Sequence, residues 1–292
     1  MQNRESFRTL FAHHHPLVTP CAHDALSARL VTQAGFKAIA IGGSAMLAAQ
    51  FALPDIGLAS LSEMLEGARN IMRGTELPCA IDADDGYGDV RSVVRTVRAY
   101  EQIGIGSMIF EDQLMTAKKP GEGRATAVVP AEDMEKKLRA AMATRSDPDV
   151  VILARTDAYK PHGLDEALRR AERYLKAGAD GIFVSGLASL EELRKVGDRL
   201  RGCIQIAVVT ERLLPLWPKP SELHSLGFNQ IIYPQFIVAR MADAVERALV
   251  ELADLATGTK PPAELESFAA AAEGLQDKVG LRSWSEIAAR YA

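Results

Sequence analysis

The 292-residue sequence has few cysteines and no pattern among them. Cys21, Cys79 and Cys203 are odd in number, widely spaced and set in apolar surroundings, so they do not predict a disulfide framework. We expect free, buried thiols, which are typical of a protein in the reducing cytoplasm.

The chain also lacks an excess of charge of one sign and a long apolar run. Its 34 basic and 38 acidic residues give a formal net charge of -4, so we expect no nucleic-acid partner. The longest apolar stretch, residues 38–53, is interrupted by glycines and polar residues and ends before Pro54. It is too short and too broken to cross a bilayer, so we expect no membrane partner, and the first residues do not indicate a secretory signal.

Short β-rich apolar runs recur along the chain, and an amphipathic helical stretch follows each of them. This alternation predicts parallel strands joined by helices. The predicted strands are Leu17 to Cys21, Ala38 to Ile41, Cys79 to Ala83, Ser107 to Glu111, Val150 to Arg155, Gly181 to Val184, Ile204 to Val208, and Gln230 to Tyr233. The predicted helices lie near 25–34, 61–72, 90–103, 131–144, 164–177, 190–200, 221–226 and 235–256.

Glycines mark the predicted helix ends, because Gly35, Gly104, Gly178 and Gly227 each follow a periodic stretch. A doubly wound open sheet would alternate in the same way, but no G-x-G-x-x-G follows the first strand. We therefore predict an α/β fold, a (β/α)8 TIM-type barrel over residues 1–258. Residues 259–292 are predicted to form a helical tail, which covers its own barrel or reaches a second subunit.

Three carboxylates gather at the end of the third predicted strand, in the run Asp82-Ala83-Asp84-Asp85 before Gly86. In an extended strand Asp82 and Asp84 point to the same face and can share a divalent ion such as Mg2+, directly or through its waters. The alternative is an acidic turn that caps the next helix.

Other polar residues follow neighbouring strands, at the end of a barrel where active sites lie. Glu111 ends the fourth strand, where it could also belong to a capping pair with Asp112, and Arg155 ends the fifth, where it could also be a structural ion-pair partner. Gly42, Gly43 and Ser44 follow the second strand and can offer backbone N–H groups to an anion. Together these residues indicate a site for a divalent ion and a small oxo acid, with Arg155 binding the carboxylate.

The chain resembles the isocitrate lyase and phosphoenolpyruvate mutase superfamily. The resemblance covers most of the predicted barrel, in the segments 22–28, 54–57, 82–88, 111–113 and 154–157 and more weakly near 226–228 and 233–234. It implies a Mg2+-dependent barrel enzyme, with Mn2+ as an alternative ion, and a homotetramer, a dimer of dimers, that exchanges its last helices. It implies Asp82, Asp84, Asp55 and Glu111 around the metal, Arg155 on the substrate carboxylate, and Gly42, Gly43 and Ser44 as the anion-binding turn.

The sequence departs from both branches of this superfamily. The lyases carry a loop cysteine in a K-K/R-C-G-H motif, where this chain has Lys118-Lys119-Pro120-Gly121-Glu122, and Ser185 and Val208 stand in place of a glutamate and an asparagine. The mutases carry E-D-K, where this chain has Glu111-Asp112-Gln113. Tyr87, Lys118 and Lys119 remain candidates to donate a proton or to close over the site, although the loop could also be an ordinary charged surface segment.

Three hypotheses of function follow. The first is a Mg2+-dependent carbon-carbon lyase that acts on a small 2-oxo or 2-hydroxy dicarboxylate through an enolate, for example by decarboxylation of oxaloacetate. The second is a phosphonomutase, an enzyme of phosphorus-carbon bonds. The third is a barrel without catalytic activity that binds a metabolite.

Overall fold

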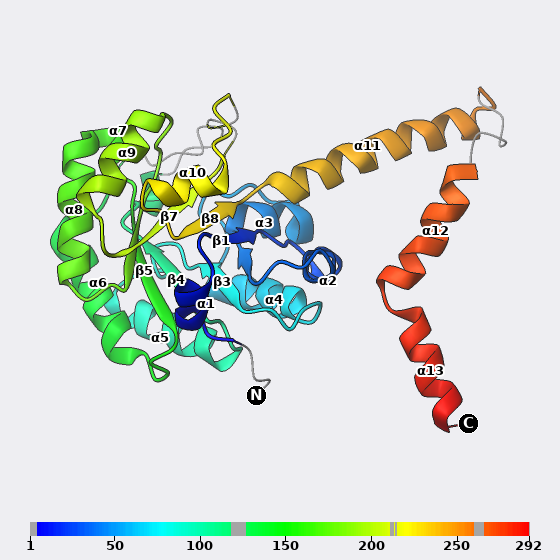
Figure 1. Cartoon of the computed structure of the whole chain (residues 1–292), viewed down its shortest axis with the longest axis horizontal. Helices are drawn as coiled ribbons and strands as arrows, with labels where there is room; N and C mark the ends of the chain where they lie inside the picture. Colours follow the sequence, from blue (N-terminus) through cyan, green and yellow to red (C-terminus); the bar gives the residue numbers. More distant parts are fainter. Residues whose placement is uncertain (1–4, 118–126, 211–212, 214, 260–265, 292) are drawn as a thin grey trace. The chain divides into compact units, whose positions relative to one another are not determined.

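A computed structural model describes residues 5–117, 127–210, 213, 215–259 and 266–291, and it contains the predicted barrel (Figure 1). Eight parallel strands form one sheet in the order β1-β8-β7-β6-β5-β4-β3-β2. A bridge between Cys21 and Ala40 joins the two edge strands, so the barrel is nearly closed. The strands are β1 (Leu17–Pro20), β2 (Ile39–Ile41), β3 (Cys79–Asp82), β4 (Ser107–Glu111), β5 (Val151–Thr156), β6 (Gly181–Val184), β7 (Ile204–Val208) and β8 (Gln230–Tyr233).

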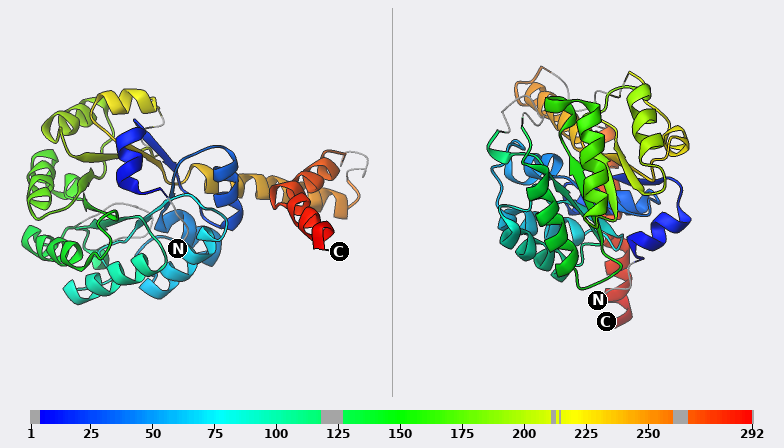
Figure 2. Two further views of the ribbon diagram at one scale, coloured as in Figure 1. Left: turned by 60° about the horizontal axis from the view of Figure 1, so that its bottom comes forward. Right: turned by 90° about the vertical axis from the view of Figure 1, so that its left-hand side faces the viewer.

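Helices form a ring around the strands (Figure 2). In the barrel part they are α1 (Phe7–His13), α2 (Ala25–Gln33), α3 (Gly43–Phe51), α4 (Leu61–Met72), α5 (Val90–Gln102), α6 (Ala131–Thr144), α7 (Tyr159–His162), α8 (Leu164–Lys176), α9 (Leu190–Arg199) and α10 (Pro220–Ser225), with a 3-10 turn η1 (Met115–Ala117). The chain continues in α11 (Phe236–Ala256), α12 (Glu266–Lys278) and α13 (Leu281–Tyr291). Gly35, Gly104, Gly178 and Gly227 all have positive φ, as predicted for glycines that follow helices.

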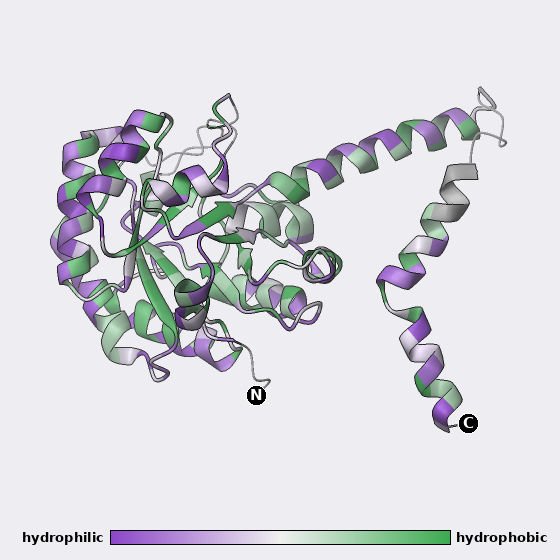
Figure 3. Cartoon of the chain, in the orientation of Figure 1, coloured by the Kyte–Doolittle hydropathy of each residue, from purple (hydrophilic) through white to green (hydrophobic). Residues whose placement is uncertain are grey.

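The barrel interior is apolar because side chains alternate along each strand, and one set of them points inward. Figure 3 shows the strands as hydrophobic and the surrounding helices as mixed. The N-terminal helix α1 contributes Phe7, Leu10 and Phe11 to the same cluster as inward residues of the strands. Ser6 caps α1, and Arg8 pairs with Asp180 at 2.7 Å. With α1 packed at the amino ends of the strands, the opposite end is left for a site.

The chain forms two compact units, Met1–Phe236 and Ile237–Ala292. The second unit holds α11, α12 and α13, whereas the sequence pattern assigned α11 to the barrel because it follows the eighth strand. Its described helices expose large apolar side chains, among them Leu249, Leu281 and Trp284. Among the described residues, no helix combines the length and the apolar composition needed to cross a membrane.

Candidate active site

A cavity of about 1080 Å³ lies in the barrel unit, where strands reach their carboxyl ends. The predicted residues Gly42, Gly43, Ser44, Asp55, Asp82 and Arg155 all line it. The structure therefore brings together the glycine turn, two of the predicted metal ligands and the predicted carboxylate-binding arginine.

Arg155 lies among three carboxylates. Its Nη1 atom is 2.8 Å from Glu111 Oε2 and 3.6 Å from Asp82 Oδ2, and its Nη2 atom donates a hydrogen bond of 2.9 Å to Asp157 Oδ1. The ring of Phe183 lies 5.4 Å from the guanidinium carbon, close enough for a cation-π contact. One positive charge thus faces carboxylates from the ends of β3, β4 and β5.

Burial and these charges shift the pKa values of the cluster. Burial raises the pKa of Glu111 well above its usual range, and the nearby Asp157 and Asp82 raise it further, against the opposing effect of Arg155. Burial lowers the pKa of Arg155, but Asp157, Glu111 and Asp82 outweigh it and hold that pKa well above its usual value. The guanidinium is therefore charged, and the surplus of carboxylates would be relieved by a bound cation.

Asp84 does not continue the strand. β3 ends at Asp82, and Asp84 has a φ of 46° in the left-handed region, so the alternation that would place both side chains on one face stops before Asp84. The Asp84 N–H donates to Asp82 Oδ1 at 3.2 Å, and its carbonyl accepts the Glu111 N–H at 2.8 Å. Asp84 ties β3 to β4 through its backbone and is not among the residues that line the cavity.

The donor set fits a hard cation that keeps most of its waters. Within the described ranges, no three His, Cys, Asp or Glu side chains are grouped to enclose a metal ion by themselves. Mg2+ does not need such a cage, because it is usually held by one or two carboxylates together with waters and substrate oxygens. Asp82 and Asp55 offer carboxylates at the cavity wall, and Glu111 adds negative charge behind them.

The glycine turn forms the start of a helix. Gly42 is the N-cap of α3, and Gly43 and Ser44 are its first residues, so the backbone N–H groups that have no partner within the helix lie at the cavity. A Cβ atom on Gly43 would lie 3.6 Å from Asp55 Oδ2, which places this carboxylate beside the helix start. A helix N-terminus favours anions, such as the carboxylate or oxo oxygens of a substrate.

The structure separates Tyr87 from the cavity. Its hydroxyl is 2.9 Å from the hydroxyl of Tyr100, burial raises its pKa well above the usual range, and it is not among the lining residues. Lys118 and Lys119, together with the rest of residues 118–126, lie outside the described residues. The flanks of this segment are paired, since the Leu114 N–H donates to Ala127 O and the Val129 N–H donates to Asp112 O.

Asp112 and Asp157 were not among the predicted site residues. Asp112 is fully buried, where its Oδ2 accepts hydrogen bonds from Tyr174 at 2.7 Å, Thr156 at 2.8 Å and Arg170 at 3.1 Å, and its Oδ1 accepts the Asp157 N–H at 2.8 Å. It therefore fixes the backbone of Asp157, which in turn holds Arg155. The feature of the sequence that could have identified them is their position, since both aspartates closely follow the ends of predicted strands.

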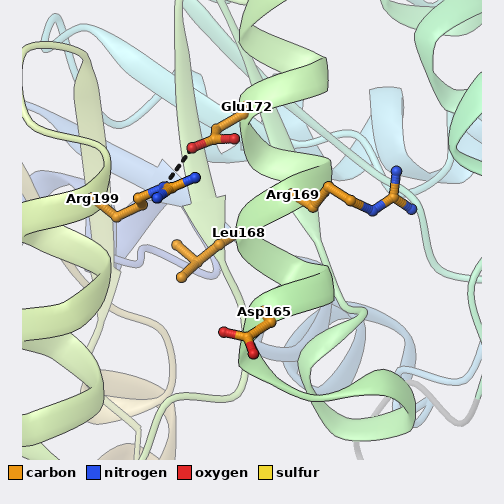
Figure 4. A pocket seen from close by; sticks show the side chains of 5 residues that line it. All are labelled: Asp165, Leu168, Arg169, Glu172 and Arg199. Atoms are coloured by element: carbon orange, nitrogen blue, oxygen red, sulfur yellow. Dashed lines mark hydrogen bonds and ion pairs between the residues drawn. The ribbon is translucent and has the colours of Figure 1, made fainter.

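A smaller hollow lies between α8 and α9, lined by Asp165, Leu168, Arg169, Glu172 and Arg199 (Figure 4). Arg199 pairs with Glu172 at 2.6 Å, and Arg169 pairs with Glu166 at 2.7 Å. These charges satisfy one another on the outer helices, away from the strand ends, so we assign no function to this hollow.

Fold and site together define a (β/α)8-barrel protein with an acidic, arginine-containing cavity at the carboxyl ends of its strands. The chain belongs to the phosphoenolpyruvate phosphomutase family, whose model matches residues 7–253. This result confirms the superfamily predicted from the sequence.

Individual relatives extend along nearly the whole chain. The 2,3-dimethylmalate lyase of Eubacterium barkeri is 34% identical over 292 residues, which are 100% of this chain and 99% of the relative. The crystal structure of phosphoenolpyruvate phosphomutase from Streptomyces platensis subsp. rosaceus matches with a TM-score of 0.85 and 27% identity over 97% of each chain. Phosphonopyruvate hydrolase in complex with oxalate and Mg++ matches with a TM-score of 0.78 and 26% identity over 94% of each chain. The first relative is named a lyase, in line with the enzyme class predicted from the sequence.

Proposed function

We propose that the protein is a Mg2+-dependent carbon-carbon lyase that acts on a small 2-oxo or 2-hydroxy dicarboxylate through an enolate. The observation that carries the proposal is the cluster of Arg155 with Asp82, Glu111 and Asp157 beside the N-terminus of α3. It combines a guanidinium group that can bind a carboxylate, carboxylate oxygens that can bind a cation, and backbone N–H groups that can bind further oxygens.

Each residue has a distinct part in this proposal. Arg155 orients the substrate carboxylate, Asp157 and Glu111 hold the guanidinium in place, and the N–H groups of Gly43 and Ser44 bind the remaining oxygens. Asp82 and Asp55, with Glu111 and Asp84 near them, would hold Mg2+ or Mn2+. The bound ion would supply positive charge where negative charge grows on the substrate oxygens. Lys118 and Lys119 stay candidates for the proton donor.

The second candidate is chemistry at a phosphorus-carbon bond. The matching family model and two solved structures carry the names of enzymes of this type, and one of them holds oxalate and Mg++. Incubation with phosphonopyruvate followed by phosphorus NMR tests this candidate, and an unchanged spectrum excludes it.

The test of the first candidate is pyruvate formation from a panel of 2-oxo and 2-hydroxy acids, with and without EDTA. We expect turnover that is lost with EDTA and restored by added Mg2+. Turnover that persists in EDTA would contradict the proposal. Binding of oxalate with Mg2+ but no turnover of any acid would favour the third hypothesis, a metabolite-binding barrel.

We also propose that the protein is a cytoplasmic homo-oligomer, a dimer of dimers. The exposed apolar side chains of α11 and α13 support the oligomer, because they need a surface to cover. Free thiols at Cys21, Cys79 and Cys203 support a reducing compartment.

A further inference from the structure

The turn that follows β3, residues 83–88, has an unusual backbone. Asp84 and Tyr87 have φ angles of 46° and 60°, and Gly86 and Gly88 also have positive φ angles. Residues with a side chain rarely adopt the left-handed region, and they stay in it only where the surrounding structure holds them there. The conformation of this turn therefore depends on contacts from outside it.

The turn is continuous with the predicted cation site. The Asp84 N–H donates to Asp82 Oδ1 at 3.2 Å, and the Ala83 N–H donates to Ile109 O of β4 at 2.9 Å. Asp82 lines the cavity, so the backbone of Asp84 orients a carboxylate of the cavity wall. A change in the conformation of the turn would displace this carboxylate.

Two helices contact consecutive carbonyl groups of the turn. The Thr96 hydroxyl of α5 donates to Gly86 O at 3.2 Å, and Lys137 Nζ of α6 donates to Asp85 O at 2.7 Å. Lys137 Nζ also lies 3.3 Å from Asp85 Oδ2. The Lys137 side chain is 11% exposed, so its ammonium group is largely removed from water and its contacts are stronger than those of a surface lysine.

We infer that Lys137 is a positioning residue, which from α6 holds the turn after β3 in the conformation that presents Asp82 to a divalent cation. The inference rests on the proposed function for the cation, because Mg2+ at Asp82 is part of that proposal. The main-chain carbonyl of Asp85 accepts the shorter contact. The effect is therefore assigned to Lys137 and not to the Asp85 carboxylate.

Lys137 would affect a bound cation in two ways that have opposite signs. Its positive charge repels a divalent ion, so removal of the charge alone would strengthen Mg2+ binding. Its contact with the turn orients Asp82, so removal of the contact weakens Mg2+ binding. The direction of the change in affinity therefore distinguishes a positioning residue from a nearby charge.

Lys137→Met tests the inference, with Lys136→Met as the matched control. Lys136 precedes Lys137 on α6, but its side chain is 61% exposed and pairs with Asp133 at 2.8 Å. In a calorimetric titration with Mg2+, we expect Lys137→Met to bind the ion about tenfold more weakly, the scale of one hydrogen bond from a charged donor. Lys136→Met should bind it like the wild type. Unchanged or tighter binding in Lys137→Met would overturn the inference.

Amide hydrogen exchange in the protein without metal measures the turn directly. In Lys137→Met, we expect the peptide that contains residues 83–88 to exchange about tenfold faster than in the wild type. Weaker Mg2+ binding without faster exchange, or faster exchange throughout the barrel, would show that Lys137 does not act through the turn. If Lys137→Met does not fold, Lys137→Gln, which keeps a shorter and neutral donor, should change both measurements in the same direction.

The two measurements also separate this inference from the proposed function. If the wild type does not bind Mg2+, the proposed function fails, and the assignment of Asp82 to a cation fails with it. Faster exchange in Lys137→Met would then still support the contact of Lys137 as the one that holds the turn, and unchanged exchange would refute it. If the wild type and Lys137→Met bind Mg2+ equally, the inference fails and the proposed function stands.

Discussion

Asp82 and Asp85 are close in sequence but differ in their surroundings, so a substitution of Asp85 is a control for the same substitution of Asp82. Asp82 lines the cavity near Arg155, whereas Asp85 pairs with Lys137 at 3.3 Å and accepts the Tyr87 N–H. We expect Asp82→Asn to weaken Mg2+ binding and to lower kcat/KM by about 100-fold or more, the typical loss for one electrostatic stabiliser. Asp85→Asn should keep both. Calorimetric Mg2+ titration and steady-state kinetics measure the effects, and full ion affinity in Asp82→Asn would contradict the assigned site.

The positive charge of Arg155 stabilises the buried carboxylates around it. Glu111 is 1% exposed and pairs with Arg155, so Arg155→Met would leave a buried acid without its cation. We expect a loss of about 3 kcal/mol in the free energy of unfolding, measured by urea denaturation. Arg199→Met breaks an ion pair at the surface, where the cost should stay below about 1 kcal/mol. If the two variants lost similar amounts of unfolding free energy, the burial of Glu111 would not determine the cost of removing its arginine.

At the level of elements, the contacts of Asp112 join β4, β5 and α8. The Tyr174 hydroxyl of α8 donates to this buried carboxylate at 2.7 Å, whereas the Tyr100 hydroxyl of α5 meets the neutral hydroxyl of Tyr87. Hydrogen bonds to charged groups are stronger than neutral ones. We therefore expect Tyr174→Phe to cost about 2 kcal/mol and Tyr100→Phe about 1 kcal/mol. Thermal and urea unfolding give the two values, and the reverse order would show that Asp112 is not charged.

The first turns of α8 carry a pH-dependent contribution to stability. Hydrogen bonds from Arg169 and Arg170 lower the pKa of Glu166 to about 2. A lowered pKa in the folded state means that the unfolded chain binds the proton first as the pH falls. The contribution is thus complete above pH 4.5 and is lost as the pH falls toward 2. Glu166→Gln should lose about 1 kcal/mol at pH 7, where solvent screens part of the effect, and should approach the wild type only at about pH 2 and below. A difference that does not change with pH would contradict this assignment.

The sequence predicted the strands of the barrel and the helices that follow them better than the additional helices α1, α3 and α7. Each of the eight strands begins and ends within one residue of its predicted bounds, because short β-rich apolar runs followed by helical stretches are typical of buried parallel strands. α1, α3 and α7 were not predicted. α1 showed the helical spacing of Phe7, Leu10 and Phe11 after the Ser6 cap, but its seven residues are short. α3 lies inside the mostly apolar stretch of residues 38–53, whose few polar residues do not form the polar face that predicts an amphipathic helix.

The site was predicted in outline, but details that depend on local backbone geometry were not. The order of strand ends was enough to bring Asp82, Glu111 and Arg155 together, because neighbouring parallel strands end at the same rim. The left-handed backbone of Asp84 removes the strand alternation on which its side-chain direction depended. The partner of Tyr87 lies on α5, and only the packing of that helix shows that the hydroxyl meets Tyr100.

At the scale of the whole molecule, the second unit presents an apolar stripe on α13. Leu281, Trp284 and Ile287 are spaced three residues apart and lie on one side of the helix, and Trp284 is 67% exposed. A monomer rarely leaves such a stripe in water, and we predict that a second copy of the chain covers it. Trp284→Asp combined with Ile287→Asp in the full chain should lower the molar mass measured by size-exclusion chromatography with light scattering. Arg282→Asp combined with Ala289→Asp introduces the same two acidic groups on the opposite face of α13 and should retain the wild-type mass. If the wild-type chain already elutes as a monomer, or if the stripe variant keeps the oligomeric mass, the stripe does not serve as a subunit interface.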